Sequence, residues 1–168
     1  MTEKSPIAII GRNVAVSFGS RAVDVPAKVD TGADSSSLWA TNIRVGEDGK
    51  LRFSLFGEGS PYYNGKVFVR DQYTVAKVRN STGHLQIRYQ TQFVVKVAGR
   101  KIRVTFNLSD RSKNTYPILL GRRAINKKFL VDVSKAEIND TEKDKAADLR
   151  VELESDPIKF HRKYFKKS

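Results

Sequence analysis

Short runs of alternating apolar and polar residues occupy the chain from residue 7 to about residue 133. Valine, isoleucine, tyrosine and phenylalanine dominate these runs, and Gly, Asn and Pro separate them. Alternation with a period of two places every second side chain on one face of an extended strand, so that this face can be buried. The predicted strands are Ile7–Ile10, Val14–Phe18, Ala27–Val29, Leu51–Leu55, Lys66–Arg70, Tyr73–Arg79, Leu85–Val97, Lys101–Asn107 and Phe129–Val133. The pattern predicts an all-β domain.

Two of the connections between these strands are typical of hairpins. Ala98-Gly99-Arg100 separates two strongly alternating runs and is short enough for a tight turn. Tyr73–Arg79 and Leu85–Val97 flank a second, polar connection, whose tip consists of Asn80, Ser81, Thr82 and Gly83.

The composition changes after Ser134. Residues 135–156 are rich in Ala, Glu, Asp and Lys, which favours a solvated helix or disorder. The segment after Pro157 interleaves lysine and arginine with phenylalanine and tyrosine, a pattern that suits docking on nucleic acid or an acidic surface, or packing on its own domain. We therefore predict a domain over residues 1–134 and a charged helical or flexible tail over residues 135–168.

Positive charge is concentrated in the predicted domain. The net charge is +13; residues 1–134 hold 22 Lys and Arg against 10 Asp and Glu, whereas residues 135–168 hold 9 against 8. A basic surface of this kind attracts ribosomes, nucleic acid or acidic peptides, and it also simply keeps a protein soluble. The sequence does not decide between binding of an acidic partner and solubility as the role of this charge.

Several classes of protein are disfavoured by what the sequence lacks. It contains no cysteine, and no apolar run approaches the roughly 18 residues of a membrane span. It contains no Gly-x-x-x-x-Gly-Lys-Ser/Thr loop and no His-Glu-x-x-His pair, and His84 has no partner at ligand spacing. We therefore expect a cytoplasmic protein that does not associate with membranes, with no cofactor and no metal ligands.

One motif carries candidate chemistry: Val29-Asp30-Thr31-Gly32-Ala33, where an apolar run ends in Asp-Thr-Gly. Peptide hydrolysis by carboxylates requires a pair, one ionised to take a proton from water and one protonated to polarise the carbonyl. Two carboxyls about 3 Å apart share one proton. The 168 residues contain a single Asp-Thr-Gly, so the second aspartate would come from another copy of the chain across a two-fold axis.

Neighbouring residues are expected to support this turn. Gly32 would donate its N–H to the Asp30 carboxylate, and the Thr31 hydroxyl would bond to the backbone across the dimer axis. Ala33 offers no hydroxyl to the carboxylate, so we expect a working pH nearer neutrality than in acid proteases. A bell-shaped pH–rate profile with both limbs below about 5 would contradict this.

A second apolar run, Pro117-Ile118-Leu119-Leu120, ends in Gly121-Arg122. We expect it to pack beneath the turn and to place Arg122 in a bidentate ion pair with Asp34. Arg123 is expected to be solvated. The hairpin with Asn80, Ser81, Thr82 and Gly83 at its tip would close over the carboxylates and bind an extended peptide by main-chain hydrogen bonds.

The order of these motifs resembles the retropepsins, the dimeric aspartic peptidases of retroviral type, from about residue 7 to 133. Within that group the chain is similar to bacterial and archaeal proteins labelled ATP-dependent zinc proteases. The resemblance rests on residues 27–33, on Gly83-His84 with Arg88-Tyr89, and on Leu119-Leu120-Gly121-Arg122 with Phe129–Asp132. It implies a closed β-barrel with one active turn per chain, formed by Asp30, Thr31 and Gly32.

The resemblance implies a homodimeric aspartic endopeptidase acting on a peptide or protein. Some members are associated with enzymes that add glutamates to a ribosomal protein, which implies a link to ribosome modification. Two alternatives remain: a catalytically silent dimer that binds ribosome or nucleic acid through its basic surface, and a zinc-dependent peptidase as the label states. The label disagrees with the motifs, which favour the aspartate.

Overall fold

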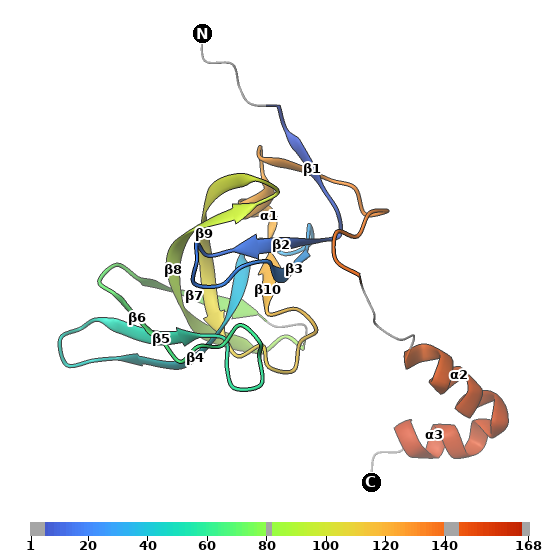
Figure 1. Cartoon of the computed structure of the whole chain (residues 1–168). Helices are drawn as coiled ribbons and strands as arrows, with labels where there is room; N and C mark the ends of the chain where they lie inside the picture. Colours follow the sequence, from blue (N-terminus) through green and yellow to red (C-terminus); the bar gives the residue numbers. More distant parts are fainter. Residues whose placement is uncertain (1–5, 80–81, 140–144, 166–168) are drawn as a thin grey trace. The chain divides into compact units, whose positions relative to one another are not determined.

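Six strands form a closed ring at the centre of the barrel unit (Figure 1). The computed structural model describes residues 6–79, 82–139 and 145–165, in two compact units, Met1–Ile138 and Asn139–Ser168. The ring runs, each strand beside the next, through β10 (Ile118–Leu120), β3 (Val25–Val29), β2 (Asn13–Ser17), β8 (Leu85–Val97), β9 (Arg100–Ser109) and β4 (Ser36–Val45). It closes because β10 pairs with both β3 and β4. The expected all-β, retropepsin-like barrel is confirmed.

The described part of the barrel unit contains five further strands and a short helix. β5 (Leu51–Leu55) and β6 (Val67–Arg70) continue the sheet beyond β4, and β7 (Thr74–Arg79) pairs with β8 alone. β1 (Ala8–Ile10) and β11 (Phe129–Val131) form a separate parallel pair, and α1 (Arg122–Ile125) follows β10 directly.

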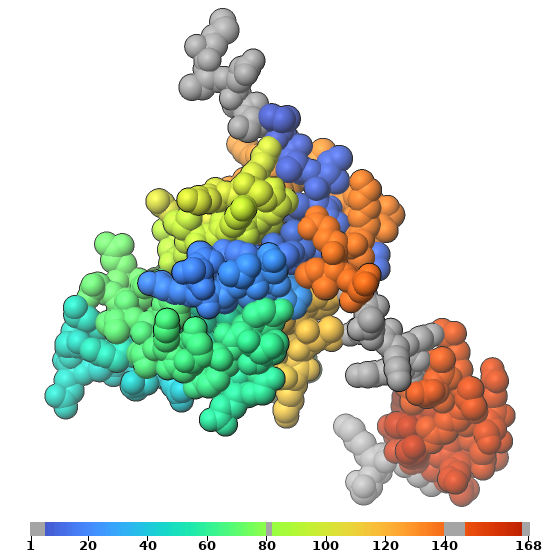
Figure 2. Space-filling view, viewed as in Figure 1, coloured from blue at the N-terminus to red at the C-terminus, as the bar shows by residue number. Residues whose placement is uncertain are grey.

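Alternation along the strands decides which side chains enter the core. On β8 the buried residues Phe93, Val95 and Val97 alternate with exposed ones, and β9 continues the pattern with Val104 and Phe106. Phe93 stacks edge-on against Phe106, with ring centroids 6.2 Å apart. On the face shown in Figure 2, the blue N-terminal strands lie against the yellow-green segment of β8 and β9. The alternating runs of the sequence therefore form one continuous core.

The tight turn predicted at residues 98–100 joins β8 to β9. Ala98 and Gly99 both have positive φ angles, 47° and 76°. Two consecutive positive φ angles are typical of the turn whose twist matches that of the flanking strands. This hairpin prediction is confirmed.

The prediction omitted β4, a strand of ten residues. Its first residues, Ser36 and Ser37, belong to a run of serines over residues 35–37, shortly after the Asp30 motif. Both are buried, and they pair with Phe106 and Asn107 of β9. Short polar residues are normally a turn signal, and here tertiary burial in the barrel overrides that preference.

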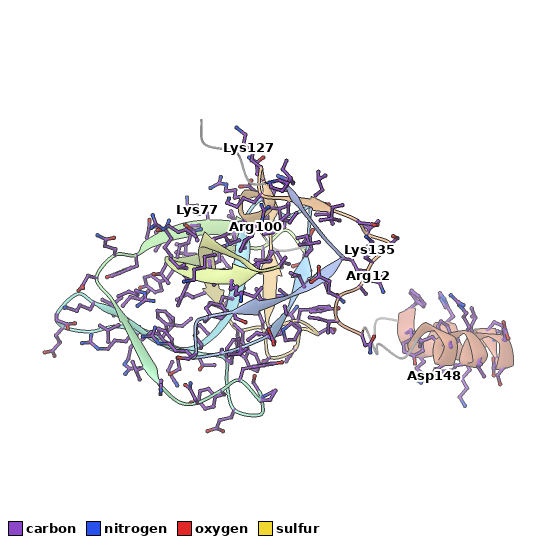
Figure 3. The ribbon with its side chains drawn as sticks, turned by 45° about the horizontal axis from the view of Figure 1, so that its top comes forward. Arg12, Lys77, Arg100, Lys127, Lys135 and Asp148 are labelled. Carbon is purple, nitrogen blue, oxygen red and sulfur yellow. The ribbon has the colours of Figure 1, made fainter. Side chains whose placement is uncertain are left out.

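The barrel unit extends four residues beyond the boundary predicted at residue 134. The backbone N–H of Arg12 donates to the carbonyl of Lys135 at 2.8 Å, and these two residues are labelled in Figure 3. The N–H of Ile138 donates to the side chain of Asn13 at 2.9 Å. Because these bonds are long-range, residues 135–138 belong to the barrel unit and not to the predicted tail.

In the second unit, the described residues form two helices, α2 (Lys145–Ser155) and α3 (Pro157–Phe165). Asp156 accepts a hydrogen bond from the Lys159 N–H at 2.9 Å, and Pro157 occupies the first turn, where its missing N–H costs nothing. Glu152 pairs with Lys163 at 2.7 Å. Hydrogen bonds from Lys163 and then from Tyr164 lower the pKa of Glu152. Of the two predicted alternatives, helix or disorder, these residues adopt the helix.

Candidate active site

Asp30 lies at the end of β3, held by both its backbone and its side chain. Its N–H donates to the carbonyl of Leu120 on β10 at 2.9 Å. Its Oδ1 accepts the N–H groups of Gly32 at 3.0 Å and Ala33 at 3.2 Å. The side chain is half-buried. Two amide donors on one oxygen fix the orientation of the carboxylate before any ligand arrives, as the sequence predicted for Gly32.

The residues after β10 hold the Asp30 turn, by which we mean residues 30–34. The N–H of Arg122 donates to the carbonyl of Ala33 at 2.7 Å, and that of Arg123 donates to Asp34 at 3.2 Å. The N–H of Gly121 donates to the Ser36 hydroxyl at 3.0 Å. These bonds join two segments almost ninety residues apart in the sequence.

Only glycine fits at position 121, because the backbone of the Asp30 turn segment leaves no room for a side chain. A Cβ at this position would collide with the backbone carbonyl of Ser35 and would lie 2.9 Å from that of Ala33. Because both obstacles are backbone atoms, a side chain could not be accommodated by a simple change of rotamer. The Gly-Arg pair that sequence reasoning placed beneath the turn therefore fits closely against it.

The two arginines share roles that were predicted for Arg122 alone. Arg122 donates to the carbonyls of Thr31 at 3.3 Å and Gly32 at 3.0 Å, while its contact with Asp34 is long, 3.7 Å. Arg123 makes the closer ion pair with Asp34, at 2.9 Å. The predicted Arg122–Asp34 ion pair is therefore present but not bidentate, because Arg122 is drawn toward the carbonyls of the turn. Arg123 is exposed to solvent, as expected, and in addition pairs with Asp34. All three side chains are more than half exposed, so these ion pairs add little stability.

A hydrogen-bonded chain that the sequence did not predict joins the turn segment to the second hairpin. Asn107 of β9 is fully buried; its amide donates to the Ser35 hydroxyl at 2.9 Å and accepts from the Gln90 amide at 2.7 Å. Gln90 lies on β8 at the base of the hairpin. The sequence signal for this link was an asparagine at the end of the predicted strand Lys101–Asn107, but its burial, which demands hydrogen-bond partners, is visible only in the structure.

The flap hairpin, residues 74–90, is formed by β7 and the first part of β8. Thr82 and Gly83 lie at its tip, and Gly83 has a φ of 85°, which favours glycine. Asn80 and Ser81 lie outside the described residues. Thr31 is exposed on the Asp30 turn, and its predicted bond to a second protomer stays a prediction.

Within the described residues, no three His, Cys, Asp or Glu side chains come together as metal ligands would. Among the described helices, none is both long and apolar enough to cross a membrane. The site of one chain thus presents a single oriented carboxylate and a glycine-arginine support, and the flap hairpin is linked to the turn segment through Gln90, Asn107 and Ser35.

Comparison with known proteins agrees with this arrangement. A family model described as "RimB-like: Retropepsin-like aspartic endopeptidase RimB" matches residues 9–142. A Legionella pneumophila protein of unknown function (DUF785) has a similar solved structure, with a TM-score of 0.61 and 28% identity, covering 77% of this chain and 95% of that one.

Curated relatives from Shewanella halifaxensis and Shewanella pealeana are each 34% identical over 134 residues, or 76% of this chain. Both are named "Probable alpha-L-glutamate ligase". The match spans only 29% of the length of these relatives, so most of each lies outside it.

Proposed function

The chain belongs to the RimB-like family of retropepsin-like aspartic endopeptidases, and from this premise we propose that it is a homodimeric aspartic endopeptidase. The observation that carries the proposal is the Asp30 carboxylate at the end of β3, oriented by the N–H groups of Gly32 and Ala33. One such group is half of a catalytic pair. The Asp30 of a second protomer supplies the other half.

In the proposed reaction, the pair holds one proton and one water molecule. The ionised Asp30 takes a proton from the water as its oxygen attacks the peptide carbonyl carbon, while the protonated Asp30 donates its proton to the carbonyl oxygen. The resulting tetrahedral intermediate collapses when the C–N bond breaks. The leaving nitrogen takes a proton from the first carboxyl, the second recovers its proton from the intermediate, and the pair returns to its starting state.

The outer surface of the barrel supports the proposed dimer. β1 and β11 form a two-stranded sheet that no other described strand joins. Ile9 and Leu130 are neighbours across that sheet, and their side chains are 56% and 58% exposed. Ile7 and Val133, at either end, are also more than half exposed. Burial of such apolar side chains and strand edges between two copies would stabilise a dimer.

For the substrate, we propose a protein that carries a run of glutamates. The relatives from Shewanella are named as ligases for alpha-L-glutamate, and a peptidase segment matching part of such a protein would act on the same kind of chain. The excess of lysine and arginine in residues 1–134 would attract it. The resemblance to proteins associated with ribosome modification supports a ribosomal protein as the proposed substrate, and the cytoplasm as the proposed location of the reaction.

The test is hydrolysis of a synthetic peptide with a C-terminal run of α-linked glutamates. Asp30→Asn should abolish cleavage, a loss of about a thousandfold or more, while circular dichroism and thermal unfolding stay unchanged. Asp24→Asn is the matched control: Asp24 is exposed, its hydrogen bonds to the described residues are with Ser17, and it lies in a separate turn, so cleavage should persist.

Three results would overturn the proposal. Cleavage that survives Asp30→Asn would exclude the aspartate pair. Cleavage that a chelator abolishes and added zinc restores, without sensitivity to a statine-type inhibitor, would favour the zinc peptidase. If the purified dimer binds the peptide but cleaves neither the peptide nor a protein that carries the run of glutamates, the catalytically silent binding protein is favoured instead.

A further inference from the structure

The flap hairpin has a face whose side chains the proposed reaction does not yet use. Because β8 is one continuous strand, residues two apart lie on the same side of the sheet. Phe93, Val95 and Val97 point into the core, so Leu85 and Ile87 lie on that same, concave side.

The pairing of β7 with β8 extends this assignment to the second strand. Val75 is opposite Tyr89, Lys77 is opposite Ile87, and Arg79 is opposite Leu85. Directly opposed residues of a pair share a face. We call the set Val75, Lys77, Arg79, Leu85, Ile87 and Tyr89 the concave face of the flap hairpin.

Most of this face has nothing packed against it in the single chain. Val75, Leu85 and Ile87 are 54%, 58% and 73% exposed, although they continue the line of the core. Lys77 and Arg79 are exposed as well, and Figure 3 labels Lys77 on β7. Apolar side chains exposed side by side on one face of a strand pair are typical of a binding surface.

The charges on the concave face have one sign. Among the described residues, neither Lys77 nor Arg79 forms an ion pair with a carboxylate, and Arg79 donates one hydrogen bond, to the Gly83 carbonyl at 3.3 Å. No member of the face is acidic. The face therefore offers aliphatic surface to a methylene chain and cations to a carboxylate beside it.

We propose that Lys77 and Arg79, together with the exposed aliphatic side chains of the concave face, form a subsite on the flap hairpin. This subsite binds the side-chain carboxylates of a glutamate-rich peptide. This inference rests on the proposed function, because it assumes that the hairpin closes over a peptide bound at the Asp30 turn. The base of the flap hairpin is hydrogen-bonded to the segment after the Asp30 turn through Gln90, Asn107 and Ser35. Closure removes water from around the ion pairs, which strengthens them.

The test separates binding from hydrolysis by using the full-length Asp30→Asn protein, which should bind without cleaving. A fluorescent peptide with a run of α-linked glutamates is titrated against it, and the same peptide with glutamines is the comparator. We expect the glutamate peptide to bind more tightly. The double substitution Lys77→Gln and Arg79→Gln should weaken its binding about tenfold or more and leave the glutamine peptide unchanged.

Arg103→Gln is the control for loss of charge alone. Arg103 is exposed on β9, between the buried residues Ile102 and Val104, so its side chain points away from the core face. A general attraction between a basic protein and an acidic peptide would be reduced similarly by substitutions at either place, whereas the subsite predicts little change for Arg103→Gln.

The outcomes distinguish the two proposals. Equal binding of the glutamate and glutamine peptides, or equal losses in the hairpin and Arg103 variants after correction for charge, would overturn the subsite while leaving the peptidase intact. Binding with the expected selectivity, together with no cleavage by the wild-type dimer, would retain the subsite and overturn the proposed reaction.

Discussion

The Asp30 turn and the flap hairpin differ in how far their groups are bonded to the rest of the barrel. In the turn, the Asp30 Oδ1 and the carbonyls of Ala33 and Asp34 accept backbone N–H groups, and Gly121 leaves no free space beneath it. In the hairpin, β7 has one neighbouring strand, and apolar side chains such as Ile87 are mostly exposed. The difference suggests that the turn sets the chemistry and the hairpin selects what reaches it.

The largest expected contrast lies within one strand. Phe93→Ala removes a ring that is 7% exposed and packed among other phenylalanines, so it should cost about 3–5 kcal/mol of unfolding free energy. Ile87→Ala, six residues earlier on the same side of β8, should change stability by no more than about 0.5 kcal/mol and should weaken peptide binding. Urea unfolding of both variants checks the contrast, and similar losses would mean that the hairpin face is packed after all.

The next effect tests the support beneath the turn. Gly121→Ala forces a methyl group against the Ser35 carbonyl and should cost about 1–3 kcal/mol or more. Gly32→Ala meets only the Asp30 Oδ1, at 3.3 Å, so it should lower cleavage with a smaller change in stability. Thermal unfolding and the cleavage rate separate the two, and an unchanged melting temperature for Gly121→Ala would contradict the close fit.

A third measurement concerns the link between the two regions. Asn107→Leu keeps the volume and removes the amide, which leaves Ser35 and Gln90 without that partner; the expected cost is about 1–3 kcal/mol. Gln90→Leu, at a half-buried position, should cost less. Double-mutant analysis should show coupling between positions 90 and 107, and strictly additive losses would contradict a connected chain.

The smallest expected effect is a shift in pH dependence at the turn. Ala33→Ser would supply a hydroxyl that stabilises the ionised carboxylate, so the acid limb of the pH–rate profile should move down by about half to one pH unit. The basic limb and the hairpin's preference for glutamate should not change. A movement of the acid limb to higher pH would contradict the proposed role of position 33.

Much of the barrel could be predicted because its strands alternate. Leu85–Val97 was predicted with its observed bounds, and the turn at Ala98-Gly99 followed from the same pattern. β4 was missed because its buried serines are turn formers in isolation, and Asn42 interrupts the strand with a φ of 53°. Its burial depends on β9 and β10, which no local pattern contains.

The candidate site was predicted in outline for a similar reason. Asp30, Gly32 and Arg122 belong to short sequence motifs whose residues interact with near neighbours in the chain or with one another. Their proximity could therefore be predicted from the sequence. Asp34 forms its closer ion pair with Arg123 and not, as predicted, with Arg122. This difference depends on side-chain directions after β10, which the local sequence does not determine. Lys77 and Arg79 were overlooked because their importance depends on the register of β7 against β8.

The central claim, that each active site uses one Asp30 from each of two protomers, is tested most directly by mixing subunits. Wild-type protein is combined with Asp30→Asn protein, the chains are allowed to exchange, and cleavage per wild-type chain is measured. With equal amounts, random pairing leaves about one quarter of the dimers with two Asp30 side chains. We predict that activity per wild-type chain falls to about half and declines in proportion to the wild-type fraction. Activity per wild-type chain that stays constant at every ratio, under confirmed exchange, would contradict the shared pair.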